Sequence, residues 1–385
     1  MKKKINIQLA SRDACTGCAA CASVCPTGSI TMREDKEGFL QPHIDAKTCI
    51  NCHKCEKTCP IVSPITPPPD FETQAYAAIN KDEAIRMRSS SGGMFHALAK
   101  WTIEQGGVVF GARFDENWDV VHDYTETLEG IEPFMRSKYV QSRIGDTFKQ
   151  AKQFLEQGRW VLYSGTPCQI GGLKADLHKD YDNLLTIDFI CHGVPSPMVW
   201  QGYLSWLNQD IVNINFRDKT KGWQTNPHVT IDSYNHTVSL HQKDDLYFCG
   251  FLKDIYLRKS CYDCCFKTVK RISDITLADA WGVQTYCPEM YDDKGTSAVF
   301  LHTEKGLSIV SMLTENFSQN SLSIDYVSRN NTSMTCSAKR SSTRQLFFFF
   351  YRFMGFGKWV RYVPKDSLFF RFKRKIKKII NKLHI

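Results

Sequence analysis

The sequence lacks three features that would have assigned it to a class at once. No stretch reaches the roughly 18 uninterrupted apolar residues of a membrane span, because the most apolar run, residues 346–351, is far too short. Neither G-x-G-x-x-G nor a Walker A motif occurs, so neither a Rossmann nucleotide site nor a P-loop is indicated. The basic start at residues 1–4 reaches Arg12 and Asp13 before any sufficient apolar run, so we expect no export signal.

The chain also lacks a broad excess of charge. Its net charge is +9, but residues 371–385 hold seven Lys or Arg and no acid, which leaves only +2 for the rest. A nearly neutral body argues against nucleic acid as the partner. Sixteen cysteines in a chain without an expected export signal point to metal or redox chemistry, and we expect a cytoplasmic protein.

Eight of those cysteines form two copies of one pattern, C-x2-C-x2-C-x3-C-P, spaced 34 positions apart. The first copy is Cys15, Cys18, Cys21 and Cys25, and the second is Cys49, Cys52, Cys55 and Cys59. This spacing is typical of bacterial ferredoxins that hold [4Fe-4S] clusters. Zinc sites pair C-x2-C units across a spacer, and disulfides need an oxidising compartment, so both alternatives fit poorly.

In two-cluster ferredoxins the fourth cysteine of each run binds the other cluster. We therefore assign Cys15, Cys18, Cys21 and Cys59 to one cluster, and Cys49, Cys52, Cys55 and Cys25 to the other. The two halves of the module would then be tied together through metal.

The rest of the chain predicts an α+β fold. Residues 29–44 have the character of a hairpin with Gly38 in its turn, and the proline-rich residues 63–69 favour a semi-rigid polyproline II linker. Hydrophobic patterns then predict strands at residues 75–79, 107–114, 160–163, 184–190, 212–216 and 228–234, and helices at 93–105, 145–156, 167–177, 197–207 and around 305–316. We expect a ferredoxin-type domain (1–62), a linker (63–74), a mixed α/β domain (75–335) and a basic aromatic tail (336–385).

Two predicted loops follow apolar strands, and each carries one cysteine, Cys168 or Cys191. Ligand-binding residues of α/β sheets lie at the carboxyl ends of strands. With Cys261 and Cys264 they complete a set of four thiols, which would hold a third [4Fe-4S] cluster. The alternative is that Cys168 and Cys191 are buried apolar thiols. Cys249, Cys287 and Cys336 have no partner pattern and are treated as structural thiols.

Residues 89–93, a serine-glycine turn, precede the helix expected from residue 93. The amide groups at such a helix start bind phosphate, whereas a serine N-cap is the commoner role of an isolated turn of this kind. Both interpretations stay open on the residues alone.

Taken together, the motifs resemble the family of coenzyme F420 hydrogenase/dehydrogenase beta subunits. The matching pieces, in the family's order, are the N-terminal cysteine runs, Ser90-Ser91-Gly92-Gly93, Gly165-Thr166-Pro167-Cys168-Gln169, Asp188 with Cys191-His192-Gly193, Cys261-x-x-Cys264, Ser273-Asp274-Ile275 and Ala278-Asp279-x-x-Gly282. The resemblance implies FAD and favours the third cluster. It also places the cofactor near Ser90, Ser91, Gly92, Gly93, Gly165 and Thr166, with Lys267 and Lys270 meeting phosphate or forming a solvated charged strand. Cys265 adjoins Cys264, so either sulfur suits the iron.

The resemblance implies an iron–sulfur flavoprotein oxidoreductase that passes electrons between a two-electron organic substrate, deazaflavin-like or other, and one-electron clusters. The resemblance also implies a setting in cell-surface polysaccharide metabolism. The alternative is a relay subunit that only conducts electrons between partner proteins. We assign no catalytic side chain from the sequence.

The C-terminal residues predict an amphipathic helix. The apolar residues Phe369, Phe372, Ile376, Ile379, Ile380 and Leu383 recur at helical spacing among the seven cations. Residues 346–350 and 359–363 are expected to add aromatic surface. Such a helix is typical of peripheral contact with an anionic membrane surface, and docking on the body or on a partner protein is the alternative.

Overall fold

The N-terminal cysteine module contains the predicted hairpin. The structure is a computed structural model that describes residues 5–67 and 71–360. The module holds helices α1 (Ala20–Ser23) and α2 (Lys54–Lys57) and the antiparallel strands β1 (Ile30–Glu34) and β2 (Leu40–Ile44). Gly38 lies in the hairpin turn with φ of 79°, as predicted. Residues 63–67 form neither helix nor strand, and residues 68–70 of the predicted linker lie outside the described residues.

The backbone of this module repeats with the same spacing as its cysteines. Gly17 and Asn51 have φ of 71° and 55°, and Ala19 and His53 have φ of 63° and 60°. Ala19 and His53 are the residues that precede α1 and α2. Non-glycine residues rarely adopt this left-handed conformation, so matching occurrences in both halves show that the sequence repeat is also a structural repeat.

The body is built on an eight-stranded mixed sheet whose order is β13-β3-β12-β11-β7-β6-β4-β5. Its strands are β3 (Gln74–Asn80), β4 (Val108–Phe114), β5 (Val120–Thr125), β6 (Val161–Ser164), β7 (Leu184–Phe189), β11 (Ile275–Asp279), β12 (Ser297–Leu301) and β13 (Phe317–Ser321). Strands β4, β6, β7 and β11 run parallel, and antiparallel strands flank them. The carboxyl ends of the four parallel strands therefore meet at one edge of the sheet.

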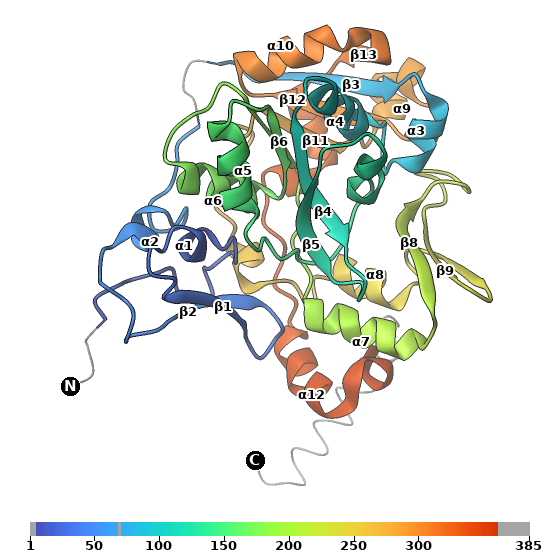
Figure 1. Cartoon of the computed structure of the whole chain (residues 1–385). Coiled ribbons are helices and arrows are strands. Elements are labelled where there is room, and N and C mark those ends of the chain that lie inside the picture. The colour runs from blue at the N-terminus through green and yellow to red at the C-terminus, as the bar shows by residue number, and fades with distance from the viewer. Residues whose placement is uncertain (1–4, 68–70, 361–385) are drawn as a thin grey trace.

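Helices cover both faces of this sheet (Figure 1). Val109 and Leu162 pack with α4 (Met94–Glu104) and α10 (Glu304–Met312) on one face. Their neighbours Val108 and Val161 pack with α5 (Thr147–Glu156) and α6 (Pro167–Leu177) on the other. Alternate side chains of a strand point to opposite faces, so these buried strands are apolar throughout. Shorter helices complete the body: α3 (Glu83–Arg88), α9 (Val283–Tyr286), α11 (Ile324–Asn330), and 3-10 turns at Glu129–Phe134, Lys259–Asp263, Pro288–Met290, Thr314–Asn316 and Thr332–Met334.

A second core lies beside the large sheet. It combines the antiparallel strands β8 (Ile211–Asp218), β9 (His228–Ser233) and β10 (Thr237–His241) with helices α7 (Pro197–Leu207), α8 (Leu246–Leu252) and α12 (Arg344–Val360). Trp200 and Tyr247 are fully buried in its centre, with ring centroids 5.0 Å apart. The predicted elements at residues 75–234 and around 305–316 are all present, and the predicted bounds of α6 and α7 match those of the structure.

The prediction that residues 346–350 form aromatic surface is wrong for two of its phenylalanines. Phe347 and Phe348 are buried in the second core, whereas Phe349 is 60% exposed. The reason is that α12 packs against α7 and α8, which the sequence pattern alone did not show. The remaining predicted tail, residues 361–385, lies outside the described residues. None of the described helices is long and apolar enough to cross a membrane.

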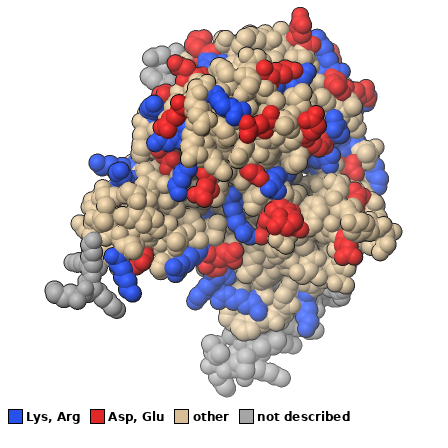
Figure 2. Space-filling view, viewed as in Figure 1, with Lys and Arg blue, Asp and Glu red and all other residues tan. Residues whose placement is uncertain are grey.

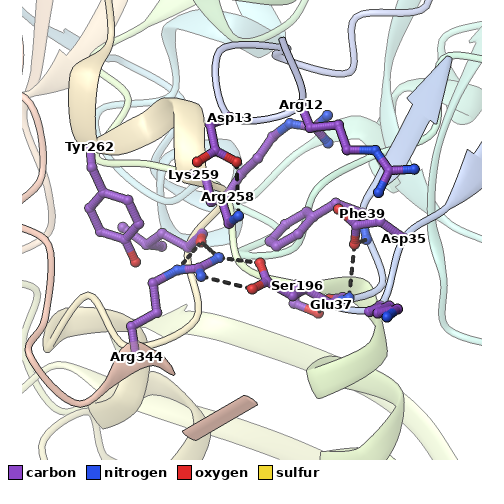
Figure 3. A network of polar contacts seen from close by, with 12 residues as sticks. Arg12, Asp13, Asp35, Glu37, Phe39, Ser196, Arg258, Lys259, Tyr262 and Arg344 are labelled. Carbon is purple, nitrogen blue, oxygen red and sulfur yellow. Dashed lines mark hydrogen bonds and ion pairs between the residues drawn. The ribbon is translucent and has the colours of Figure 1, made fainter. Parts of the chain in front are cut away.

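The turn of the module's hairpin docks onto the body (Figure 3). The guanidinium of Arg344 donates to both carboxylate oxygens of Glu37, and Ser196 donates its hydroxyl to the Glu37 carbonyl. Gly38 packs so closely that a Cβ there would lie 2.3 Å from the Cβ of Met198. The hairpin turn and the start of α7 are therefore in direct contact.

This contact predicts that Gly38→Ala is more destabilising than an equivalent change elsewhere. Gly158 is the matched control, because its φ of 78° is like the 79° of Gly38 but no atom lies within 4 Å of a Cβ built on it. Both alanines incur the left-handed strain of about 1 kcal/mol, and only Gly38→Ala adds overpacking of about 1–3 kcal/mol. Chemical unfolding of the cofactor-loaded variants measures the difference. Equal losses of unfolding free energy would show that the turn does not dock as described.

Candidate functional site

The first predicted cysteine set is brought together in the module. Burial raises the pKa of the Cys18 thiol to about 11, and Cys15 and Cys59 act on the same thiol electrostatically. Burial also raises the pKa of Cys21, with contributions from Cys18, Cys15 and Cys59. Cys59 belongs to the second sequence run, so the structure supports the exchange of the fourth cysteine between runs.

The second predicted set lines a small cavity. Its wall contains Cys49, Cys52 and Cys55 from the second run and Cys25 from the first. Cys49 and Cys55 are buried, whereas Cys52 is exposed. This is the reciprocal exchange that the predicted assignment requires.

The third predicted set also lines one cavity, at the carboxyl edge of the parallel strands. Cys168 is the second residue of α6, directly after β6, and Cys191 follows β7. Cys261 and Cys264 enter from residues 259–264, and all four thiols line the same cavity. Among the described residues, no three His, Cys, Asp or Glu side chains are placed to hold a metal ion, so these thiols surround a space and do not converge on a point.

Cys264 is more closely coupled to this set than Cys265. Burial raises the pKa of the Cys168 thiol well above its usual value, and Cys264, Cys191 and Cys261 each contribute electrostatically. The pKa of Cys265 is raised by burial and then by Cys264 and Asp263, with no contribution from the other three thiols. Both cysteines line the cavity, but the electrostatic coupling favours Cys264 as the fourth member.

Three cations line the same cavity, and their closest partners are neutral. Arg258 donates to the carbonyls of Cys15 and Leu40. Lys267 donates to the carbonyls of Cys191 and Ser333. Arg271, the third, donates to the carbonyls of Phe266 and Met334 and lies 3.9 Å from the carboxylate of Asp188. Arg258 and Lys267 have no acid among these partners, and an uncompensated charge out of water is costly, so the cavity favours an anionic occupant.

This cysteine-lined cavity also borders the N-terminal module. Ala14 and Thr16, on either side of Cys15, contribute to its wall. Close by, Cys18 packs on α6, where a Cβ at Gly172 would lie 3.0 Å from the Cys18 sulfur. The first and third cysteine sets are therefore neighbours, although they are far apart in the sequence.

A much larger cavity, of about 520 Å³, lies on the other side of the loop at residues 191–194. It too is formed at the carboxyl ends of β6, β7 and β11, where ligands of open α/β sheets bind. Five of the residues predicted to hold the cofactor line it: Ser90, Ser91, Gly93, Gly165 and Thr166. Its volume is in the range of pockets that hold small molecules, roughly 300–1,000 Å³. Residues 191–194 contribute to both cavities, so the two share a wall.

The serine-glycine turn is held rigidly at one side of this large cavity. Ser90 accepts from the amide of Ser137, and the Ser91 hydroxyl donates to the Thr296 carbonyl. Gly92 does not line the cavity, since a Cβ there would lie 2.2 Å from the Ala78 carbonyl oxygen. Gly93, with φ of 88°, turns the chain into α4, so the first amides of that helix face the cavity.

Another part of the wall of this cavity contains Thr166, which caps α6. Its amide donates to the Gln169 side-chain oxygen at 2.9 Å, and Pro167 occupies the first helical position. This N-terminal capping arrangement fixes Cys168 at the start of the helix. The loop can therefore present Gly165 and Thr166 to the large cavity and Cys168 to the cysteine-lined one.

Two buried side chains in the wall of the large cavity have a polar atom without a hydrogen-bond partner. His122 donates from Nε2 to the Ser164 carbonyl, 3.0 Å away, but its Nδ1 has no partner. Burial lowers the pKa of His122 to about 4, so the ring is neutral at pH 7. Asp188 accepts from the Thr276 hydroxyl at Oδ1, but its Oδ2 has none. Burial raises the pKa of Asp188 to about 6, against the opposing effects of Arg271 and Thr276.

The two lysines predicted to lie near the cofactor occupy different places. Lys267 lies at the cysteine-lined cavity, and Lys270 is exposed and lines neither cavity. His122 and Arg258 were missed. Neither belongs to a spaced motif, and no signal in the sequence distinguishes them from ordinary core and surface residues. Cys249 and Cys287 are buried, whereas Cys336 is exposed, which does not suit a packing role for that thiol.

Comparison with known proteins finds similarity in both the module and the body. Residues 158–320 match the family described as the carboxyl terminus of the beta subunit of coenzyme F420 hydrogenase/dehydrogenase, and residues 14–62 match the 4Fe-4S dicluster domain. The F subunit of the F420H2 dehydrogenase of Methanosarcina mazei is 23% identical over 336 residues, which cover 80% of this chain and 90% of that protein. An uncharacterized ferredoxin of Methanocaldococcus jannaschii is 35% identical over 52 residues, covering 14% of this chain and 66% of that protein. One chain from the F420-reducing [NiFe] hydrogenase complex of Methanosarcina barkeri has a TM-score of 0.49 and 19% identity, covering 70% of this chain and 92% of that one.

The cysteine module and the matched dicluster domain define an iron–sulfur electron-transfer protein. The match over residues 158–320 confirms the resemblance to coenzyme F420 hydrogenase/dehydrogenase beta subunits that the motifs predicted. Its mixed α/β body with an N-terminal ferredoxin-like module has the predicted fold class.

The buried carboxyl of Asp188 predicts a pH-dependent cost in stability. Its pKa is raised in the folded state, so its protonated form favours folding at low pH, and this contribution is lost as the pH rises from about 4 through about 6. The loss approaches about 3 kcal/mol, by the conversion of about 1.4 kcal/mol per pKa unit. Asp188→Asn should remove it, so the variant should gain unfolding free energy relative to the wild type across this range. Chemical unfolding between pH 4.5 and 7 measures the difference, and parallel curves would contradict the prediction.

Proposed function

We propose that this protein is an iron–sulfur flavoprotein oxidoreductase with three [4Fe-4S] clusters and one FAD. The observation that carries the proposal is the wall of residues 191–194, which the large cavity and the cysteine-lined cavity share. An electron acceptor or donor in the large cavity would be separated from a cluster in the other by a single loop. The matches to the beta-subunit family and to the dicluster domain support a redox protein. The two cavities that share a wall support a flavin beside a cluster.

The residues of the cysteine-lined cavity fit a cluster. Cys168, Cys191, Cys261 and Cys264 supply four sulfur ligands, which iron in a cubane prefers. Burial raises the pKa of Cys191 to about 11 while Lys267 and Arg271 oppose it, so this thiol is protonated at pH 7 and binding of iron would release its proton. The buried cations then face the negative charge of four thiolates.

The residues of the large cavity fit FAD. Amides at the start of α4 and the serine hydroxyls of the turn at residues 89–93 suit phosphate, and the capped loop at Gly165 and Thr166 lines the same cavity. His122 and Asp188 line it too, and each has a buried polar atom without a hydrogen-bond partner. FAD would supply the conversion between two-electron and one-electron chemistry.

The arrangement gives an order to the electron path. The cysteine-lined cavity touches the large cavity at residues 191–194 and the first cysteine set at Ala14 and Thr16. The second set, with the exposed Cys52, lies at the far side of the module. Electrons would therefore pass between the flavin and a redox partner protein through the third, first and second clusters, in that order or its reverse.

The organic substrate is proposed by analogy with the relative from Methanosarcina mazei, which is named for reduced F420. We propose a planar two-electron carrier of the deazaflavin kind, which would enter the large cavity beside the flavin. The setting in cell-surface polysaccharide metabolism stays a prediction, because no contact in the structure bears on it.

Cofactor analysis tests the proposal. Anaerobically purified protein should contain about twelve irons per chain, as three four-iron clusters require, and acid should release FAD. Cys168→Ser and Cys261→Ser should each lower the iron content by about four while the N-terminal clusters persist. Cys336→Ser is the control, since Cys336 is exposed and does not line any of the three cysteine sites.

Other outcomes would change the conclusion. About eight irons, unaffected by Cys168→Ser, would exclude the third cluster. Protein that holds iron but binds no flavin after reconstitution would favour the alternative, a relay subunit without a substrate pocket. Chemically reduced protein that small organic acceptors reoxidise, in the absence of any partner protein, would favour the enzyme.

We also propose peripheral membrane contact through the C-terminal residues. The support within the described residues is that α12 leads toward this segment with Phe349 and Phe353 60% and 76% exposed. The face of the body drawn in Figure 2 has Lys and Arg interspersed with Asp and Glu, so a basic segment would be the part that attracts anionic lipid.

The membrane proposal predicts salt-sensitive binding to phosphatidylserine-containing vesicles. Each cation near anionic lipid contributes about 1 kcal/mol, so truncation after Asp366, which removes the seven cations, should abolish cosedimentation at low salt. Iron and flavin contents of the truncated protein should equal those of the full chain. If the full chain does not bind the vesicles at low salt, or if the truncated chain loses its flavin, the segment has a structural role instead.

A further inference from the structure

Arg258 is a buried cation between the first and third cysteine sets. Its side chain is nearly inaccessible, and the residue is 1% exposed. Nε donates to the carbonyl of Cys15 at 2.7 Å, and a Cβ on Gly17 would lie 2.6 Å from Nη1. On its other side Arg258 lines the cavity of Cys168 and Cys261. The guanidinium is thus next to the first run of cysteines and to the third set at once.

This guanidinium has no acid partner among the described residues. Its other acceptors are the Leu40 carbonyl, 2.9 Å from Nη2, and the side-chain oxygen of Gln141, 3.0 Å from Nη1. Arg344, at the same junction and equally buried, is paired with the carboxylate of Glu37 (Figure 3). The nearby carboxylate of Asp13 is bound to Lys259 instead. The junction therefore contains one neutralised arginine and one that is not neutralised.

A buried, unpaired charge costs several kcal/mol, so its retention requires an anion. The groups that would lie on either side are anionic, since each cluster with four thiolates carries net negative charge that grows by one when an electron arrives. Arg258 and Cys261 line the same cavity, so the cation lies beside one of the sulfur ligands proposed for the third cluster.

We infer that Arg258 is the shared counter-charge of the first and third clusters, and that it stabilises the reduced form of both. The inference rests on the proposed function, because it presumes the third cluster. The cavity of the second set contains Lys54 and not Arg258, so its cluster should be insensitive to this residue. Arg258 would thereby keep the two neighbouring clusters close in potential, whichever way the electrons move.

Potentiometric titration of the anaerobic holoprotein, followed by electron paramagnetic resonance, tests this inference. Arg258→Gln should lower two of the three reduction potentials, each by about tenfold in the one-electron equilibrium constant, or about 59 mV. The third potential should stay unchanged and serves as an internal reference. Arg258→Lys, which keeps the charge, should restore most of both shifts.

A second variant keeps the arginine in place. Gln141→Glu puts a carboxylate at the position that accepts from Nη1, so it neutralises Arg258 and should lower the same two potentials. If the Arg258→Gln protein does not bind iron, Gln141→Glu still tests whether Arg258 sets the two potentials. The control is the double variant Lys259→Gln with Asp13→Asn, which removes the neighbouring exposed ion pair without changing net charge and should leave all three potentials unchanged.

Failure of the inference and failure of the proposed function are distinguishable. Twelve irons with potentials that do not respond to Arg258→Gln or Gln141→Glu would overturn the inference alone. Equal shifts of all three potentials, or shifts in the double control, would overturn it too. Eight irons in the wild type would overturn the third cluster, and the inference would then predict a shift in one potential of two.

Discussion

The contact between the N-terminal cysteine module and the body is the constraint on which the other sites depend. The cysteine-lined cavity takes part of its wall from Ala14 and Thr16 of the module, so it is complete only when the module is docked. The two buried arginines, Arg258 and Arg344, hold that contact by donating to the module's backbone and to Glu37. Assembly of the module and formation of the third site are therefore one event.

This dependence explains why polar groups are concentrated at the junction. Buried donors and acceptors must be paired, and each pairing specifies one geometry. A purely apolar contact would tolerate sliding of the module by a few ångströms. Such sliding would change the distance between the first and third cysteine sets, whereas a junction with fixed donors and acceptors allows a single register.

Much of the fold was predictable because its signals are local. Cysteine spacing, the proline after each run and the apolar strands followed by loops depend on neighbouring residues, and each was recovered in the structure. The capping of α6 by Thr166 and Gln169 is also local, which is why the predicted bounds of that helix, Pro167–Leu177, match. The same holds for Gly38, since a hairpin turn needs a residue that tolerates positive φ.

The features that the sequence did not predict depend on contacts between residues that are far apart in the chain, so no local pattern indicates them. Phe347 and Phe348 have the same composition whether they face solvent or α7, so only tertiary packing decides their burial. Arg258 follows no motif, and its importance comes from the absence of an acid among its partners in the described part of the chain. His122 is a strand residue whose unpartnered nitrogen is evident only once the cavity around it is known.

The position of Gly172 has a consequence for the spacing of the redox centres. Gly172 lies one helical turn after Cys168 on α6, so the two residues share a face and are separated by about 5–6 Å along the axis. Cys18 rests on Gly172 because no side chain intervenes. The helix thus sets the distance between the first cysteine set and the third. Insertion of a single residue between positions 168 and 172 would turn Cys168 about 100° around the helix axis relative to Gly172, and so away from Cys18, even though every cysteine remained in the chain.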